Sequence, residues 1–575
     1  MRRVEYFRRT ITFCIMIALT ACSFSSAPPP TPTVLIPPTQ TAIPTSSPTP
    51  YPAPEHRIGT RVENGVGEFY DRVTNEKFIP RGMNYVRLGA QTNPYGESTT
   101  FHAVFDPDKY DPQRIGTALQ SMHADGFNVV RVFLSQNTIG TAHGGLSQVY
   151  MKNVTDFLMQ AKQNQIYVMF TEDWLPAGKY DSIIGRDCCT NFNLMNLNYL
   201  SPAGLAANIE FFKDFVQSLF DLRAPTDAIF SYELRNEMFY ETNQPPLSLT
   251  QGKITAANGE VYDMTSSQDK EKMVNENLVY WIDTVRAAIL EKDPTALVSV
   301  GFFQPQTPNP SRVGDARLAV TEPAIWKSQA DFIDLHAYPG YELSLPQYVE
   351  NFGVKDMQQK PILMGEFGAE VSRFVSTDLA TQRLISWQVE SCRYGFDGWL
   401  FWTWDATEQP DFFNALLDHG RIEKALAPLT RPDACSAGTS NTSPTNLALN
   451  ASVVASHALV NQLAQNAIDG APETLWSSGA DPKQWIEIDL GKPYTVTSIR
   501  LIVAQSPDGN TIHQLWVRGA KGVLQLIHEF DGNTADNQVL EFIPEFPMAN
   551  VQVIRVVTTQ GPSWVAWKEI EVFGK

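Results

Sequence analysis

Eight short apolar runs, separated by amphipathic segments, constrain the fold of this 575-residue chain more than any other feature. They recur between about residues 60 and 430, with little of the apolar–polar alternation of a strand that has one face in water. The segments between them, such as Ile115–Met122 and Leu205–Val216, space apolar residues as a helix packed on one face does. The runs are Phe78–Asn84, Phe127–Phe133, Ile166–Thr171, Ala228–Leu234, Leu297–Gly301, Phe332–His336, Ile362–Glu366 and Gly398–Thr403.

Buried strands joined by helices predict a parallel sheet with a helical cover. Eight such units over residues 57–432 fit a (β/α)8 TIM barrel with loop insertions. A doubly wound open sheet is the alternative, but that fold usually carries a glycine-rich phosphate turn after its first strand. The first run ends in Arg81–Asn84, which is not such a turn.

A second domain follows a linker rich in Ser and Thr at residues 433–445. Beyond the linker the helical periods disappear, and alternating stretches such as Trp485–Leu490 and Gln552–Val557 take over. Residues 446–575 are therefore predicted to form an antiparallel β-sandwich.

The amino terminus is typical of an exported protein. Residues 1–21 combine arginines with a short apolar run, Ile11–Leu19, which indicates a secretory signal too short to span a bilayer. Leu19–Cys22 resembles a bacterial lipobox, which implies a lipid on the Cys22 thiol; ordinary cleavage at the same bond would leave Cys22 unmodified. The Pro-, Ser- and Thr-rich residues 22–56 are typical of an extended spacer. We expect an extracytoplasmic lipoprotein that contacts the membrane only through this anchor.

The net charge and the cysteines limit which ligands the protein is expected to bind. The net charge of −18 argues against nucleic acid, which attracts basic patches. Four cysteines follow the signal region, and in an oxidising compartment they can pair, although spacing does not define the connectivity. They are Cys188, Cys189, Cys392 and Cys435. Without CxxC spacing or a histidine cluster they do not indicate a metal site.

Two carboxylates lie at the ends of apolar runs: Glu237 shortly after the fourth run and Glu366 as the last residue of the seventh. The carboxyl ends of barrel strands carry the active site. Two carboxylates that face each other there suit glycoside hydrolysis, which in retaining enzymes requires a separation of ~5–5.5 Å. A single glutamate in such a place is more often an ion-pair or capping partner, so the pair carries the hypothesis.

Motifs in strand order resemble glycoside hydrolase family 5 and its cellulase- and mannanase-like clan. They are Ile79–Tyr85, Gly126–Arg131, Asn236-Glu237, His336 with Tyr338, Gly365–Gly368 and Trp402. The resemblance implies that Glu366 is the nucleophile and Glu237 the acid/base. It also implies that Asn236 binds the sugar 2-hydroxyl and that catalysis needs no cofactor.

Physical chemistry supports these roles. Arg131 beside Glu366 would keep that carboxylate ionised, and Tyr338 can donate a hydrogen bond to it. We expect ionised Glu366 to raise the pKa of Glu237. Trp402 offers a flat face for a sugar ring, as do Trp404 and Trp174.

The third strand departs from the family pattern, because it ends Thr171–Trp174 where many members have a histidine. Asp173 or Trp174 is expected to line the cleft there. His336 taken alone would more often be a structural histidine.

Residues 446–575 resemble the coagulation factor V/VIII C-type (discoidin) domain of carbohydrate-binding module family 32. The motifs are Ala467–Gly470, Thr474–Ser478, Trp485–Gly491 and Trp567–Gly574. The resemblance implies a structural Ca²⁺, and oxygen donors at Asp469, Thr474 and Glu569 suit that ion. Trp564 and His513 are candidate ligand-binding residues, although Trp564 fits packing against the sandwich edge equally well.

Together these features predict a retaining hydrolase of β-glucan or β-mannan type polysaccharide, held on its substrate by a glycan-binding module. The alternative is a catalytically inactive surface lipoprotein that binds carbohydrate.

Overall fold

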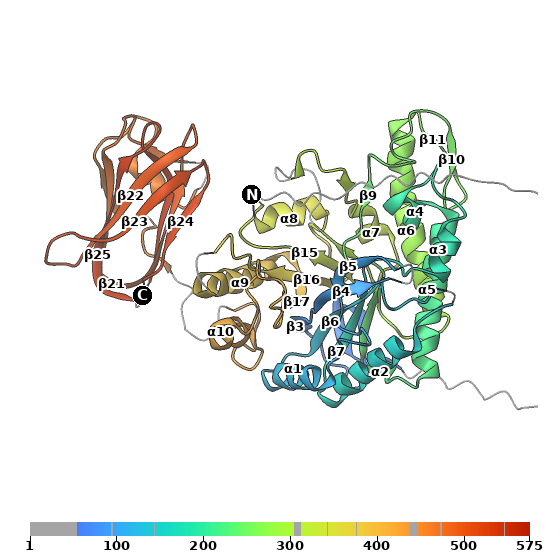
Figure 1. Ribbon diagram of the computed structural model, residues 1–575. Coiled ribbons are helices and arrows are strands. Elements are labelled where there is room, and N and C mark those ends of the chain that lie inside the picture. Colours follow the sequence, from blue (N-terminus) through green and yellow to red (C-terminus); the bar gives the residue numbers. More distant parts are fainter. Residues whose placement is uncertain are drawn as a thin grey trace, which may run out of the picture. The chain divides into compact units, whose positions relative to one another are not determined.

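The computed structural model describes residues 55–574, except 94–95, 143, 304–311, 342, 375–376, 437–444, 450, 472–473 and 545–546. The predicted signal segment, Cys22 and the spacer up to residue 54 lie outside this part. A barrel body and a β-sandwich make up the described chain (Figure 1). None of the helices within it is long and apolar enough to cross a bilayer.

The predicted parallel barrel is confirmed. Its strands are β3 (Arg81–Asn84), β6 (Val129–Leu134), β7 (Tyr167–Glu172), β8 (Ile229–Glu233), β12 (Val298–Ser299), β13 (Gly301–Phe302), β15 (Ile333–His336), β16 (Ile362–Gly368) and β17 (Phe396–Trp402). The fifth run forms both β12, which pairs with β8, and β13, which pairs with β15, so the ring closes. This closure excludes the doubly wound open sheet.

Helices surround the barrel strands (Figure 1). They are α1 (Pro112–Ala124), α2 (Gln148–Gln163), α3 (Lys179–Ile184), α4 (Leu194–Leu200), α5 (Pro202–Asp221), α6 (Ser267–Leu290), α7 (Glu322–Lys327), α8 (Leu345–Phe352), α9 (Thr377–Ser391) and α10 (Leu417–Leu426). Local sequence sets where they begin: Asp111 accepts a hydrogen bond from the Arg114 N–H at 3.0 Å, and Ser201 accepts one from Gly204 at 2.8 Å. Proline follows both caps, with the backbone angle that a first helical turn requires.

Short strands decorate this body. They are β1 (Ile58–Glu63), β2 (Val66–Asp71), β4 (Leu88–Thr92), β5 (Ser98–His102), β9 (Tyr240–Glu241), β10 (Lys253–Thr255), β11 (Val261–Asp263) and β14 (Arg317–Leu318). The β1–β2 hairpin contributes Ile58 and Phe69 to a buried apolar cluster with Val129, Met169, Phe230, Leu297, Phe332, Leu363 and Leu400. Val129, Phe230 and Leu363 of this cluster lie within the first two residues of their strands, so apolar side chains fill that end of the barrel.

Contacts extend the folded body slightly beyond the predicted bounds. His56 is buried, and its Nε2 lies 2.8 Å from Asp293 Oδ2. At the other end Cys435 is joined to Cys392, with Cα atoms 5.7 Å apart, so the body reaches into the predicted 433–445 linker. Cys188 and Cys189 are joined as well.

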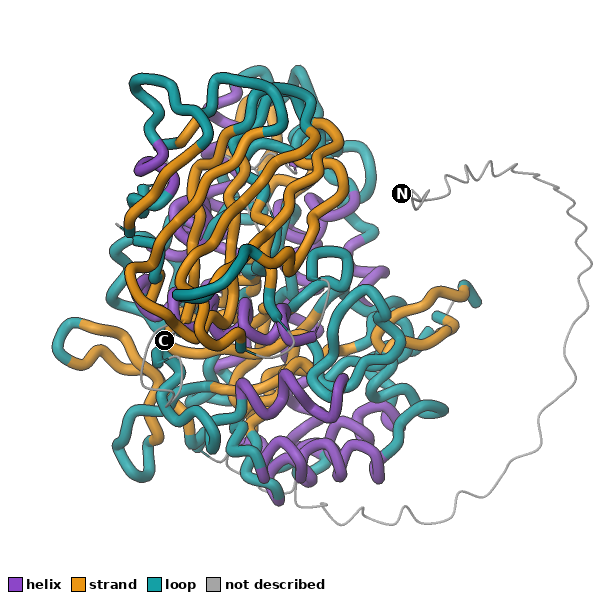
Figure 2. Tube along the Cα trace, turned by 90° about the vertical axis from the view of Figure 1, so that its left-hand side faces the viewer, coloured by secondary structure: helices purple, strands orange, loops and turns teal. Residues whose placement is uncertain are grey.

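The second domain is an antiparallel sandwich, as predicted. Its strands are β18 (Thr445–Asn446), β19 (Ser452–Ala455), β20 (Trp476–Ser477), β21 (Gln484–Val503), β22 (Gly509–Arg518), β23 (Gln525–Thr534), β24 (Val539–Phe542), β25 (Met548–Gln560) and β26 (Ala566–Gly574). Figure 2 shows the long strands alongside one another. The first half of β21 pairs with β25 and the second half with β26, around a core that includes Trp476 and Trp567.

Candidate active site

Glu366 lies near the carboxyl end of β16 and is 5% exposed. Arg131 Nη1 donates a hydrogen bond to its Oε1 at 2.6 Å. The Tyr338 hydroxyl donates one to Oε2 at 2.7 Å. Each carboxylate oxygen therefore has its own donor, which fixes the orientation of the group at the barrel mouth.

Arg131 of β6 is fully buried and joins several strands. Its Nε donates to Glu233 at 2.9 Å, Nη2 donates to Asn236 Oδ1 at 2.6 Å, and Nη1 also donates to Asn84 Oδ1 at 2.9 Å. Burial disfavours its charge, but the carboxylates of Glu233 and Glu366 outweigh burial and hold the pKa of Arg131 above its ordinary value. The site thus contains a permanent buried cation.

Glu237 follows β8, and a third of its side chain (33%) is exposed. His336 Nδ1 lies 3.0 Å from Glu237 Oε1 and 3.6 Å from Glu366 Oε2. One ligand-type atom from each of the three residues lies within 4.8 Å of the others. The two carboxylates can therefore act on the same bond.

The pKa values of the two glutamates are shifted in the opposite sense to the prediction. Burial opposes the cationic form of His336, but Glu366, Asp334 and Glu237 outweigh it and raise the pKa of His336 to about 10. Burial raises the pKa of Glu366, whereas the hydrogen bond and charge of His336 outweigh burial and lower the pKa of Glu237. The expected rise in the pKa of Glu237 is wrong for the free site, because the hydrogen bond and charge of His336 outweigh burial. At 3.0 Å, His336 Nδ1 and Glu237 Oε1 are close enough to share a proton.

Asp173 and Trp174, the residues predicted to line the cleft after strand three, both contact Arg235. Asp173 is 9% exposed, and its Oδ1 lies 3.3 Å from Arg235 Nη1. The Arg235 guanidinium lies 4.7 Å over the Trp174 ring, and Trp174 is 37% exposed. Trp174 therefore has a rigid backing and a face that solvent can reach.

Trp402 ends β17 and packs edge-on against Phe133, with ring centroids 5.7 Å apart. His102 of β5 stacks on Phe133 at 4.0 Å, and burial lowers the pKa of His102 to about 4. An uncharged imidazole thus reaches this region from a hairpin after strand one, in a chain that lacks the strand-three histidine.

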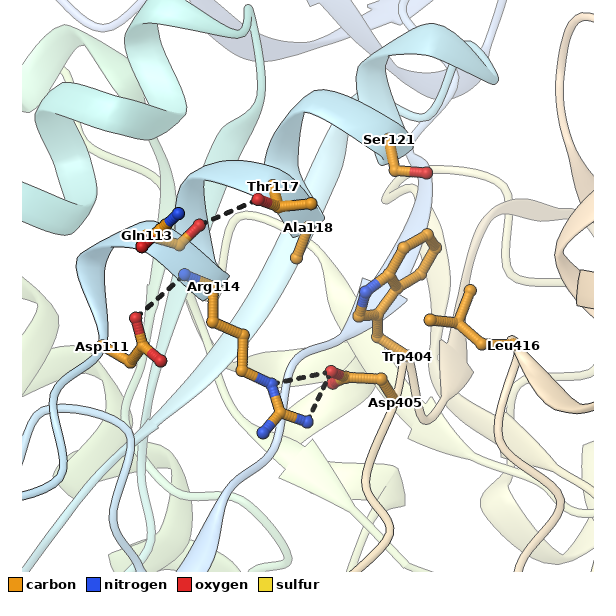
Figure 3. A pocket seen from close by; sticks show the side chains of 9 residues that line it. All are labelled: Asp111, Gln113, Arg114, Thr117, Ala118, Ser121, Trp404, Asp405 and Leu416. Atoms are coloured by element: carbon orange, nitrogen blue, oxygen red, sulfur yellow. Dashed lines mark hydrogen bonds and ion pairs between the residues drawn. The ribbon is translucent and has the colours of Figure 1, made fainter.

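Trp404 lies outside the site formed by Glu237 and Glu366. It is buried and lines a pocket of about 390 Å³ between α1 and the loop after β17 (Figure 3). In that pocket Arg114 donates to Asp405 Oδ2 at 3.0 and 2.8 Å. Trp404 is therefore not a stacking face beside the glutamates.

Sequence reasoning missed three residues of the site: Asn84, Glu233 and Asp334. All are fully buried. Each is a polar residue within an apolar run near the carboxyl end of a strand, and that signal could have identified them.

In the sandwich, the predicted calcium donors lie together. The Thr474 hydroxyl donates to Asp469 Oδ2 at 2.9 Å, and Glu569 accepts from the Gly470 N–H. Burial raises the pKa of Glu569 to about 7. Its Oε2 is buried and has no hydrogen-bond partner in the described part of the chain.

The two candidate ligand residues differ in access. Trp564 is 48% exposed and lines a cavity of about 750 Å³ together with Gln505, Asp536 and Lys568. His513 is 4% exposed, its Nδ1 lies 2.9 Å from Thr558 Oγ1, and burial lowers its pKa to about 4. Of the two, Trp564 is the side chain that a ligand can reach.

A TIM barrel that brings two carboxylates together at its strand ends has the architecture of a glycoside hydrolase. The family model for cellulase (glycosyl hydrolase family 5) matches residues 88–408, and the chain belongs to this family. The model for the F5/8 type C domain matches residues 450–570.

Three solved structures are similar to parts of this chain. The chain is similar to the exo-β-1,4-mannosidase Op5Man5 from Opitutaceae bacterium strain TAV5, with 18% identity, TM-score 0.40, and coverage of 64% of this chain and 58% of that one. The chain is also similar to the β-mannanase of the blue mussel Mytilus edulis, with 14% identity, TM-score 0.40, and coverage of 66% of this chain and 99% of that one. The second domain is similar to the family 32 carbohydrate-binding module of C. perfringens NanJ in complex with galactose, with 22% identity, TM-score 0.20, and coverage of 21% of this chain and 92% of that one. The search of curated proteins gave no match.

Proposed function

We propose that the barrel hydrolyses a β-linked polysaccharide, of the β-glucan or β-mannan type, with retention of anomeric configuration. The observation that carries this proposal is the approach of Glu237 and Glu366 oxygens to within 4.8 Å. Retaining enzymes hold their carboxyl groups ~5–5.5 Å apart, whereas inverting enzymes leave ~6.5–9.5 Å for a water molecule.

In the first step Glu366 attacks the anomeric carbon and forms a carbon–oxygen bond as the glycosidic bond breaks. Glu237 gives its proton to the departing oxygen, and His336 can resupply that proton through their 3.0 Å hydrogen bond. Arg131 and Tyr338 hold Glu366 in place for the attack.

In the second step water attacks the anomeric carbon, Glu237 accepts its proton, and the bond to Glu366 breaks. Asn236 binds the sugar 2-hydroxyl, and Trp402 stacks on the ring. Asp173 and Trp174 line the neighbouring part of the cleft.

The sandwich is proposed to tether the enzyme to glycan, with Trp564 as a stacking face in its cavity. Asp469, Thr474 and Glu569 would hold a structural Ca²⁺. Oxygen-only donors and the unpartnered buried Oε2 of Glu569 fit this hard cation, which would tie the turn at Asp469 to β26.

Anchoring through a lipid on Cys22 is a separate proposal. Cys22→Ser should move the protein from the membrane fraction to the soluble extracellular fraction. Unchanged fractionation would refute lipidation.

Hydrolysis of glucans, mannans and xylans by wild type and Glu366→Gln tests the enzymatic proposal. We expect the wild type to release reducing sugar from at least one polysaccharide and the variant to release almost none. A wild type that binds polysaccharide but cleaves neither it nor aryl glycosides would favour the inactive surface-binding alternative.

A further inference from the structure

Behind His336, on the side away from Glu237, lies a buried group of polar atoms. His336 Nε2 is 3.9 Å from Asp334 Oδ2, and Glu233, Asp334 and His336 each place a ligand-type atom within 4.8 Å of the other two. Within the described residues, His336 Nε2, Asp334 Oδ2 and Glu233 Oε1 are all buried without a hydrogen-bond partner that meets normal geometry. Buried polar atoms are costly to leave unpaired, so protons must be shared among these three.

Burial raises the pKa of Glu233 well above its ordinary value, although the charge of Arg131 on its Oε2 opposes this rise, so a proton is favoured on the unpartnered Oε1. The charge and hydrogen bonding of His336 outweigh burial and keep the pKa of Asp334 below its ordinary value. Asp334 thus holds the negative charge, and its other oxygen accepts the Gly365 N–H at 2.8 Å.

An ionised carboxylate only accepts hydrogen bonds, so a proton on the His336 nitrogen 3.9 Å away is the arrangement that suits both buried atoms. We propose that Asp334 is a positioning residue that fixes a proton on His336 Nε2, so that the transferable proton occupies the hydrogen bond between His336 Nδ1 and Glu237. This inference rests on the proposed function of Glu237 as the acid/base. It explains how Glu237 can supply a proton although its own pKa is lowered.

The surroundings of Asp334 define the substitution that tests this role. In Asp334→Asn the buried Gly365 N–H still needs an acceptor, so the amide oxygen stays on Gly365. The amide NH₂ then faces His336 Nε2, which must become an acceptor and lose its proton. His336 would carry its remaining proton on Nδ1 and donate it to an ionised Glu237, leaving the pair one proton short.

Substrates whose leaving groups differ in their need for protonation can detect the missing proton. Matched 2,4-dinitrophenyl and phenyl β-cellobiosides and β-mannobiosides serve as probes, because dinitrophenolate departs without protonation and phenolate does not. For Asp334→Asn at pH 7 we expect kcat/KM to fall about 10²-fold with the phenyl substrate and to change little with the dinitrophenyl one. Equal losses with both substrates would overturn the proposal.

The pH profile gives a second readout. The charged or titratable groups around His336 are Asp334 on its own strand, Glu233 and Glu237 from β8 and its end, Glu366 from β16, Arg131 from β6, and Tyr338. Removing the Asp334 charge lowers the pKa of the His336–Glu237 pair. The alkaline limb of kcat/KM for the phenyl substrate should therefore move to lower pH, and an unmoved limb would contradict the proposal.

Two controls separate this role from a structural one. Asp293→Asn alters another buried aspartate bonded to a histidine, His56, away from the site, and should leave the ratio of the two substrates unchanged. Tyr338→Phe removes a donor to Glu366 and should slow both substrates alike.

If Asp334→Asn does not fold, ¹⁵N NMR of His336 in the wild type decides. A proton bound to Nε2 at neutral pH is expected, and a proton on Nδ1 alone would overturn the proposal. A wild type inactive on every substrate would instead refute the proposed function, a result distinct from equal losses in the variant.

Discussion

The barrel site and the sandwich cavity differ in how their side chains are held. Arg131 and Glu366 are buried and joined by hydrogen bonds to several strands, whereas Trp564 is 48% exposed on a loop. Chemistry requires groups fixed before substrate arrives, while glycan binding needs an accessible aromatic face. Damage to the barrel site should therefore abolish turnover and leave glycan binding intact, and damage to the sandwich should do the reverse.

Glu366→Gln tests this separation with the largest effect. Loss of the nucleophile should lower kcat by about 10⁴-fold or more, because the covalent intermediate cannot form. Initial rates on the preferred polysaccharide measure the loss, and pull-down on insoluble polysaccharide should show unchanged binding. Activity within about tenfold of wild type would remove Glu366 from the mechanism.

Glu237→Gln should cost less, about 10²–10⁴-fold in kcat/KM for substrates with poor leaving groups. Its amide cannot supply the proton, but dinitrophenyl glycosides form the intermediate without it. Addition of azide, which attacks the intermediate without a general base, should accelerate turnover of the dinitrophenyl substrate. No response to azide and equal losses on both substrates would count against an acid/base role.

Trp476→Ala should destabilise the sandwich domain without changing the barrel site. Trp476 is fully buried, so truncation should lower the free energy of unfolding of that domain by about 3–5 kcal/mol. Calorimetry should show the sandwich transition at lower temperature, while kcat on a soluble aryl glycoside stays unchanged. A parallel loss of kcat would show that the two regions are coupled.

The calcium donors predict a pH effect confined to the sandwich. Glu569 has a pKa of about 7 in the fold against an ordinary value of 4.5, so its neutral form is favoured on folding. Its contribution is present below pH 4.5 and is lost as pH rises through 7, by up to about 3 kcal/mol. Thermal unfolding in EDTA should show this loss, and Ca²⁺ or Glu569→Gln should reduce it. A pH-independent transition in EDTA would contradict this account.

Trp564→Ala should have the smallest effect. Loss of one stacking face should weaken polysaccharide binding by about 0.5–1.5 kcal/mol, roughly tenfold at most. Isothermal titration with soluble polysaccharide measures it, and kcat on a small aryl glycoside is the control. Unchanged affinity would place the glycan site elsewhere on the sandwich.

The same contrast explains what the sequence predicted. Eight apolar runs specify a closed barrel, and Glu237 and Glu366 stand out because a strand end fixes where a side chain points. The charge distribution between them depended on His336, whose contact joins separate strands and cannot be derived from spacing. Asp334, by contrast, precedes His336 by two residues on the same strand, and a polar residue inside an apolar run is a signal that could have identified it.

The sandwich fold followed from alternation, but its ligand site did not. His513 lies in β22, in the buried phase of the alternation that includes Leu515 and Val517, and is 4% exposed. Trp564 lies on a loop, which has no periodic pattern from which its exposure could be predicted.

Proton NMR of the first-formed product tests the central claim most directly. Hydrolysis of a β-linked substrate should first yield the β-anomer, which then mutarotates, because two displacements at the same carbon restore its configuration. An α-anomer as the first product would show a single displacement by water and would contradict the assignment of Glu366 as nucleophile.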